Sequence, residues 1–149
     1  MGSKVAKLLT AGMALFSMLL APSGHAASTP DATPIKVVYH IDDTTRASAL
    51  LQNVANQLRA VPGTKIAVVA HGKGIDFMLN NAQDANGNPY NVMMETLAQQ
   101  GVDFKICNNT LKGRHLTAAD VAYPVVVVPS GVAEIARLQA QEGYVYVKP

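Results

Sequence analysis

The sequence has 149 residues, a length that allows one domain and excludes two. Hydrophobic residues make up 49% and charged residues 15%, which excludes a disordered chain, whose signature is low hydrophobicity with high net charge. The formal net charge is +2. Without Lys4 and Lys7 it is zero, because 10 of the 12 basic residues remain and the chain has 10 acidic residues. A neutral domain lacks the surplus of Lys and Arg that general nucleic-acid or anionic-membrane binding requires, so we expect neither partner.

The N-terminal residues have the pattern of a secretory signal peptide over residues 1–26. The two lysines come first, a mostly apolar run follows over Leu8–Ala21, and Gly24–Ala26 places small residues before a cleavage site. The apolar run is shorter than the roughly 20 residues that span a bilayer. We expect cleavage after Ala26, a flexible leader over residues 27–34 and a periplasmic mature protein without membrane attachment. An uncleaved anchor helix is the alternative.

Strands and helices are expected to alternate along residues 35–149. Runs rich in β-branched residues predict five strands, at Ile35–Ile41, Lys65–His71, Val102–Cys107, Tyr123–Val128 and Tyr144–Val147. Apolar residues at helical spacing predict helices at Ala47–Leu58, Asn91–Gln100 and Ser130–Gln141, and a capping box starts a short helix at Thr117–Asp120. This alternation predicts an α/β layered fold with a mainly parallel sheet and helices on both faces.

The ends of the predicted strands carry most of the residues with useful chemistry. Parallel sheets bind ligands outside the carboxyl ends of their strands, and these ends share one edge of the molecule. We therefore expect a cleft at that edge, and its candidate residues are His40, His71, Gly72, Lys73, Cys107, Asn108 and Ser130.

Cys107 is the best single candidate for chemistry, because a lone thiol in an oxidising compartment has no intrachain partner. Its reactive form is the thiolate, which nearby positive charge favours. Lys105 lies on the same strand face, and Lys112 and Arg114 follow in the next loop. The alternative is a buried, inert cysteine that packs as a small apolar residue.

His71 precedes Gly72-Lys73-Gly74, and the two glycines permit close approach of a backbone to a ligand. His71 is either a base or anion-binding group beside Cys107, or a structural histidine bonded to a backbone carbonyl. The segment lacks the spacing of a phosphate-binding loop.

Two imidazoles and a thiolate suit zinc or copper, but His40, His71 and Cys107 have no local ligand spacing. We therefore expect no metal or cofactor. Asp42-Asp43 and Ser130 are typical of helix caps, although Ser130 also lies at the predicted cleft.

Several segments together resemble the DsrE/DsrF-like family over essentially the whole mature chain. They are Ala70–Gly72, Gly101–Leu111, Val127–Gln139 and the closing Gly143–Pro149. The resemblance implies a three-layer α/β/α fold with a five-stranded, mainly parallel sheet, and a homo-oligomer that is a trimer or hexamer. It also implies that Cys107 carries sulfane sulfur as a persulfide and passes it between proteins.

Two functions therefore stay open. The first is a periplasmic sulfur carrier in which Cys107 accepts sulfur from a donor protein or molecule and His71 favours the thiolate. The second is a non-catalytic oligomeric module that binds a small ligand or a protein and has a structural cysteine. The first requires an accessible Cys107 with a lowered pKa, whereas the second allows the thiol to be buried.

Overall fold

The protein is described by a computed structural model that covers residue 2 and residues 33–149. Its sheet has five strands, all parallel, in the order β4-β3-β2-β1-β5. The strands are β1 Lys36–Ile41, β2 Lys65–Ala70, β3 Val102–Cys107, β4 Val126–Val128 and β5 Val145–Val147. The α-helices are α1 Ala47–Ala60, α2 Tyr90–Ala98, α3 Asn108–Gly113 and α4 Gly131–Glu142. The expected signal peptide and most of the leader lie outside the described residues.

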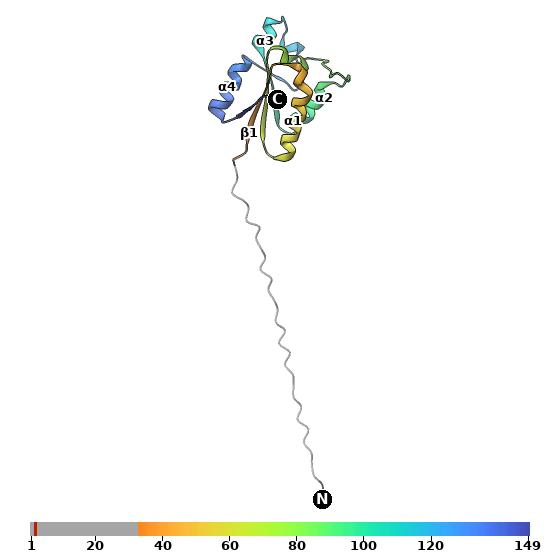
Figure 1. Cartoon of the computed structure of the whole chain (residues 1–149), viewed down its shortest axis with the longest axis vertical. Coiled ribbons are helices and arrows are strands. Elements are labelled where there is room, and N and C mark those ends of the chain that lie inside the picture. The colour runs from red at the N-terminus through yellow and green to blue at the C-terminus, as the bar shows by residue number, and fades with distance from the viewer. Residues whose placement is uncertain (1, 3–32) are drawn as a thin grey trace. The chain divides into compact units, whose positions relative to one another are not determined.

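Helices cover both faces of the sheet, which confirms the predicted α/β/α layers. Figure 1 shows α4 on one side of the sheet and α1 and α2 on the other. The larger core lies under α1 and α2, and the smaller one under α4. The small core joins Val38, Ala67 and Val69 of the sheet to Ile135 and Leu138 of α4. Alternate strand residues thus face α4, and these include the candidate residues His40 and Cys107.

The segment after β3 differs from the prediction, because residues expected to form a loop form the short helix α3. Asparagine, threonine and glycine are weak helix formers and give no helical signal in the sequence. Leu111 holds the helix in place, because its side chain is completely buried in the larger core. Packing therefore overrides propensity here.

The expected caps are present at three helix starts. Asp43 caps a 3-10 turn, η1 (Thr44–Arg46), by accepting from the Thr45 N–H at 3.0 Å. Thr117 and Asp120 form a complete capping box at η3 (Ala118–Asp120). Ser130 is the N-cap of α4 and accepts from the Ala133 N–H. In the part of the chain that the structure describes, no helix has the length and apolar character needed to cross a membrane.

Candidate functional site

The ends of β2 and β3 place His71 and Cys107 beside each other. Ala70 pairs with Ile106 in the parallel register, so His71 and Cys107 are the next residues on neighbouring strands. Side chains alternate between the faces of a sheet, and both residues follow the pattern of the α4 face. The structure therefore brings together the two residues that we expected to act as a thiol and its neighbour.

Gly131, the first residue of α4, packs against both of these side chains. A Cβ placed on Gly131 would lie 3.2 Å from the Cβ of Cys107 and 3.3 Å from the Cβ of His71. Those two Cβ atoms are thus within about 6.5 Å of each other, the sum of the two distances. A side chain at position 131 would therefore require Cys107 and His71 to shift by a few tenths of an ångström, and glycine avoids this.

Backbone and hydroxyl donors surround the Cys107 thiol. Burial raises the pKa of the thiol, but the nearby Gly131 N–H, the Thr110 hydroxyl and the N–H groups of Thr110 and Asn109 together outweigh burial, so the pKa lies below its ordinary value. These N–H groups open α3 and α4, where the helix dipole also favours negative charge. The thiol is nevertheless buried, with Cys107 only 5% exposed.

Lys105 does not provide the positive charge that we expected beside the thiol. Its ammonium lies 2.6 Å from the Glu134 carboxylate of α4, and Arg137 binds the same carboxylate at 2.8 Å. Glu134 thus neutralises Lys105, and the thiolate depends on hydrogen-bond donors instead. The sequence-based interpretation of Lys105 is wrong because its partner is 29 residues away along the chain.

A hydrogen-bonded chain of three rings lies on the same face of the sheet. The Nε2 atoms of His40 and His71 are 2.6 Å apart, and the Nδ1 atom of His40 lies 2.7 Å from the Tyr146 hydroxyl. The two imidazole rings are stacked, with centroids 4.6 Å apart. Burial lowers the pKa of His40, and the charge of His71 lowers it further. The chain links the residue next to Cys107 to an exposed tyrosine at the edge of the sheet.

The glycines after His71 approach the protein's own backbone. A Cβ on Gly74 would lie 2.4 Å from the carbonyl oxygen of Ile41, and Gly72 has a φ of +56°. They let the 3-10 segment η2 (Gly72–Met78) cross the end of β1. The close approach that we predicted for a ligand is thus made, at Gly74, by β1 itself.

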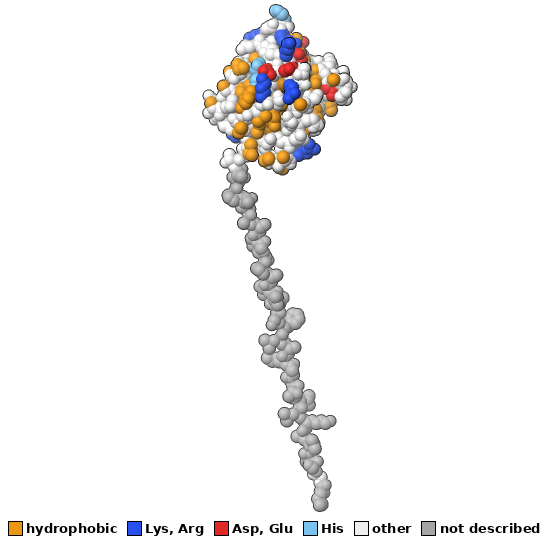
Figure 2. Space-filling view, viewed as in Figure 1, with side chains coloured by type: hydrophobic (Ala, Val, Ile, Leu, Met, Phe, Trp, Pro, Cys, Tyr) orange, Lys and Arg blue, Asp and Glu red, His pale blue; other side chains and the backbone are white. Residues whose placement is uncertain are grey.

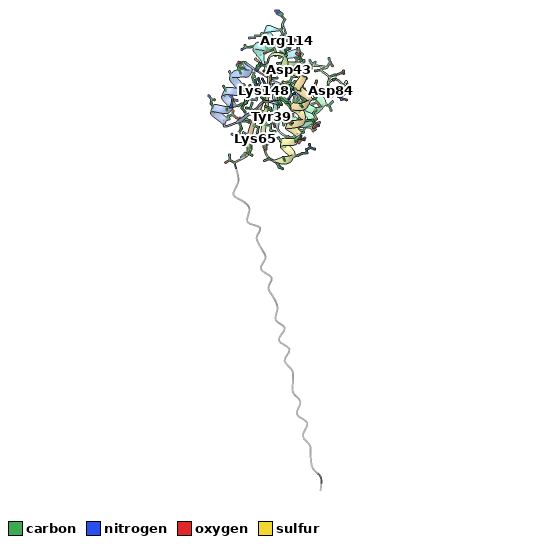
Figure 3. The ribbon with its side chains drawn as sticks, viewed as in Figure 1. Tyr39, Asp43, Lys65, Asp84, Arg114 and Lys148 are labelled. Carbon is green, nitrogen blue, oxygen red and sulfur yellow. The ribbon has the colours of Figure 1, made fainter. Side chains whose placement is uncertain are left out.

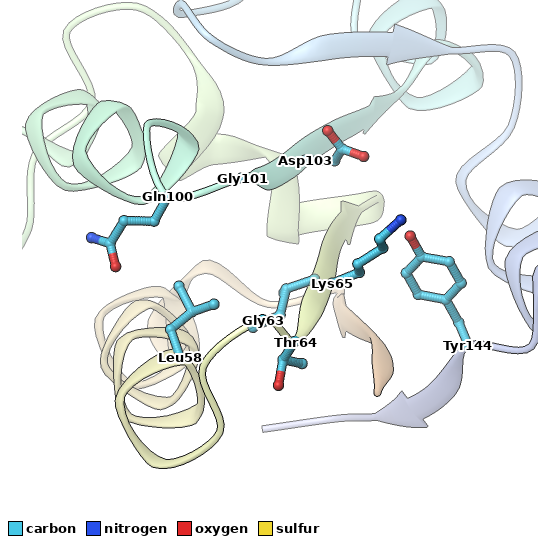
Figure 4. A pocket seen from close by; sticks show the side chains of 9 residues that line it. Leu58, Gly63, Thr64, Lys65, Gln100, Gly101, Asp103 and Tyr144 are labelled. Atoms are coloured by element: carbon cyan, nitrogen blue, oxygen red, sulfur yellow. The ribbon is translucent and has the colours of Figure 1, made fainter. Parts of the chain in front are cut away.

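Lys73, Asn108 and Ser130 all lie at the same end of the sheet. Lys73 is exposed on η2, Asn108 is the first residue of α3, and Ser130 caps α4. Gly72 and Lys73 line an open pocket of about 590 Å³, together with Asp76, Thr110, Gly113 and Arg114. A second pocket, shown in Figure 4, lies at the opposite end, where β2 and β3 begin; Lys65 and Tyr144 line it. It is therefore remote from the thiol.

The histidines and the thiol do not form a metal site. Among the described residues, no three His, Cys, Asp or Glu side chains are placed to hold one ion. The weaker hypothesis of a metal site at His40, His71 and Cys107 has no support from this geometry.

Sequence reasoning missed three residues of the site, namely Thr110, Gly131 and Tyr146. Strand alternation could have placed Tyr146 on the α4 face. Its contact with His40 could not have been found, because that contact depends on β5 lying next to β1. Thr110 and Gly131 lie in the strand-end segments that resemble the family, but their effect on the thiol depends on α3 and on the packing of α4, which local pattern does not give.

Comparison with known proteins gives one family and related structures. A sequence profile of the DsrE/DsrF-like family matches residues 32–149. The structure is similar to that of MTH1491, a protein of unknown function from Methanobacterium thermoautotrophicum, with 34% identity and a TM-score of 0.68, covering 77% of this chain and 99% of that one. It shares its fold with the ychN protein from E. coli, with 15% identity and a TM-score of 0.60, covering 79% and 100%. No curated protein matches it significantly.

Proposed function

We propose, because this chain belongs to the DsrE/DsrF-like family, that it is a sulfur carrier that holds sulfane sulfur as a persulfide on Cys107. The observation that carries the proposal is the position of Cys107 at the end of β3, against the first residues of α3 and α4, whose polar groups lower the pKa of its thiol. A lowered pKa enlarges the thiolate fraction at neutral pH, and the thiolate is the nucleophile in sulfur exchange.

The transfer is redox-neutral overall. The Cys107 thiolate attacks the outer sulfur of a donor R–S–SH, a new S–S bond forms on Cys107, and the donor's S–S bond breaks. The leaving thiolate R–S⁻ takes a proton and departs as R–SH. In this proposal His71, which follows β2 beside Cys107, takes the thiol proton before attack and passes it along His40 and Tyr146, to which it is linked by hydrogen bonds. An acceptor thiolate reverses the process.

The mass of the intact protein tests this proposal. The mature protein is treated with a persulfide donor, beside a Cys107→Ala control. We expect a gain of one sulfur per chain that is absent from the control and reversed by a reductant. No gain, with a thiol that resists alkylation until the protein is unfolded, would leave Cys107 as a packing residue.

One observation favours the second function, an oligomeric binding module with a structural cysteine. Cys107 is only 5% exposed, and α4 packs directly on it. In that case Cys107→Ser leaves ligand or partner binding unchanged, whereas the sulfur carrier loses all transfer activity. The two functions are thus separated by one variant.

We also propose that the protein is exported to the periplasm and forms a trimer or hexamer. The expected signal peptide supports export. Exposed apolar side chains support assembly; they include Val126 on the edge strand β4, Val132 on α4 and Tyr146 on the opposite edge strand β5. Cell fractionation with the mass of the mature chain tests export, and native mass spectrometry tests assembly. A full-length cytoplasmic protein, or a monomer at micromolar concentration, would contradict them.

A further inference from the structure

The pocket lined by Gly72 and Thr110 has charges of both signs. Its cationic side chains are Lys73 and Arg114, and its carboxylate is Asp76. Arg114 and Asp76 form an ion pair in which each side chain stays about two-fifths exposed, so both ions remain open to a ligand. Figure 2 shows acidic and basic side chains side by side over this end of the domain, and Figure 3 labels Arg114 and Asp43 there, away from Lys65.

Lys73 provides a cation that is available to a ligand. Within the described residues it makes no ion pair, although it weakly favours the charged form of Asp43 nearby. Its backbone carbonyl accepts from the Thr44 hydroxyl at 2.8 Å, which fixes the chain while the ammonium stays free. The charged side chains that line the pocket are thus two cations and one carboxylate, which give a net charge of +1.

Thr110 connects this pocket to the thiol. It lines the pocket, its hydroxyl accepts from the Gly72 N–H at 3.1 Å, and the same side chain helps to lower the pKa of Cys107. Thr110 is thus shared by the pocket and by the surroundings of the thiol, although Cys107 itself does not line the pocket.

We propose that this pocket receives the sulfur donor, and that the donor is a small persulfide of the amino-acid type, with an ammonium group and at least one carboxylate. Its carboxylate pairs with Lys73 and Arg114, and its ammonium pairs with Asp76. This inference rests on the proposed function and specifies its substrate class. A purely anionic donor meets the Asp76 carboxylate, and an uncharged donor leaves the three ions without partners.

Gly113 gives a way to fill the pocket without disturbing the fold. It lines the pocket, and a Cβ placed on it meets no atom within 4 Å. Gly113→Leu therefore projects its side chain into open space. Lys112 lies on the same helix, is exposed and does not line the pocket, so Lys112→Gln is a matched control for loss of a cation.

Binding is measured first, with an unreactive probe. NMR spectra of the mature protein are recorded with S-methylcysteine and with uncharged 2-(methylthio)ethanol. We expect S-methylcysteine to shift the amide signals of Gly72, Thr110 and Gly113 and to bind at least five-fold more tightly than the alcohol. Lys73→Gln and Asp76→Asn should weaken its binding at least three-fold, Gly113→Leu should abolish it, and Lys112→Gln should leave it unchanged. Equal binding of both probes, or shifts elsewhere only, overturns the proposal.

Transfer is measured next, by the rate at which Cys107 gains sulfur from cysteine persulfide or 2-hydroxyethyl persulfide. We expect the first donor to react at least five-fold faster, and Gly113→Leu to remove that advantage. Equal rates for both donors in the wild type overturn this inference and leave the sulfur carrier standing. Failure of every donor to load Cys107 overturns the proposed function, and the donor pocket with it.

Discussion

The Nε2 atoms of His40 and His71 lie 2.6 Å apart, so one proton at most lies between them. One imidazole must accept with its lone pair while the other donates, and the Tyr146 hydroxyl completes the chain at the Nδ1 atom of His40. Two protonated imidazoles at this distance would repel each other. The hydrogen bond between the two imidazoles therefore tolerates one positive charge, and protonation of both rings would break it.

Stability should fall as the pH drops below the ordinary histidine pKa. Burial and the charge of His71 lower the pKa of His40 from 6.5, so the unfolded chain binds a proton that the folded chain resists. This group's contribution is complete above pH 6.5 and is lost as the pH falls through the lowered pKa. Urea unfolding at pH 8 and pH 5 measures the loss, and His40→Gln should reduce it. A variant whose stability falls as steeply as the wild type's would contradict this assignment.

Removing the Glu134 carboxylate should destabilise the protein by about 2 kcal/mol, a figure discounted for the solvent exposure of Arg137. Arg137, Lys105 and their hydrogen bonds lower the pKa of Glu134 to about 2. Glu134→Gln leaves the ammonium of Lys105, which is only 18% exposed, without its carboxylate. Chemical denaturation at pH 7 measures the difference.

The same ion pairs have a defined pH window. Because the folded pKa lies below the ordinary 4.5, the stabilisation is complete above pH 4.5 and is lost as the pH falls toward 2. Glu142→Gln is the matched control, since its carboxylate is 40% exposed at the outer end of the network and should cost less than about 0.5 kcal/mol. Equal losses for the two variants would show that burial of Glu134 has no energetic weight.

Much of the fold could be predicted from the sequence pattern, because β1 and β2 are apolar runs buried on both faces of the sheet and the helices bury apolar residues at helical spacing. Strand ends on one edge of a parallel sheet could be predicted, but the contact of His71 with Cys107 could not, because it depends on β2 lying next to β3. The position of β5 next to β1 could not be predicted, because strand order depends on tertiary packing and not on local pattern. The contact between His40 and Tyr146 follows from that order.

The electrostatics of the thiol could not be predicted for a different reason. Charge in the sequence pointed to Lys105, but a salt bridge to Glu134 removes that charge, and the effective donors are mostly backbone N–H groups. Backbone groups have no sequence signature unless a helix start is recognised. The start of α3 cannot be recognised in the sequence, because asparagine and threonine are weak helix formers.

Gly74→Ala should destabilise the protein by about 2 kcal/mol or more. Its Cβ would lie 2.4 Å from the Ile41 carbonyl oxygen and 2.8 Å from the Cα of Asp42, so backbone must move at the end of β1. Gly113→Ala is the matched control, because its Cβ enters open space and alanine restricts the unfolded chain. We expect that control to be neutral or slightly stabilising in thermal and urea unfolding. Similar stabilities for the two variants would mean that η2 can move away from β1 at little cost.

Thr110→Val should raise the pKa of Cys107 and slow its reactions at neutral pH. Valine keeps the shape of the side chain but cannot donate to the sulfur, while the N–H donors of Gly131, Thr110 and Asn109 remain. The thiolate fraction at pH 7 then falls, because the protonation equilibrium shifts toward the thiol.

The absorbance of the thiolate near 240 nm, followed against pH, measures this shift, and the pH dependence of alkylation checks it. Thr110→Ser, which restores the hydroxyl, should return the titration toward that of the wild type. A titration of Thr110→Val identical to the wild type's would show that the backbone donors alone set the pKa, and the hydroxyl would then serve only to accept from the Gly72 N–H at 3.1 Å.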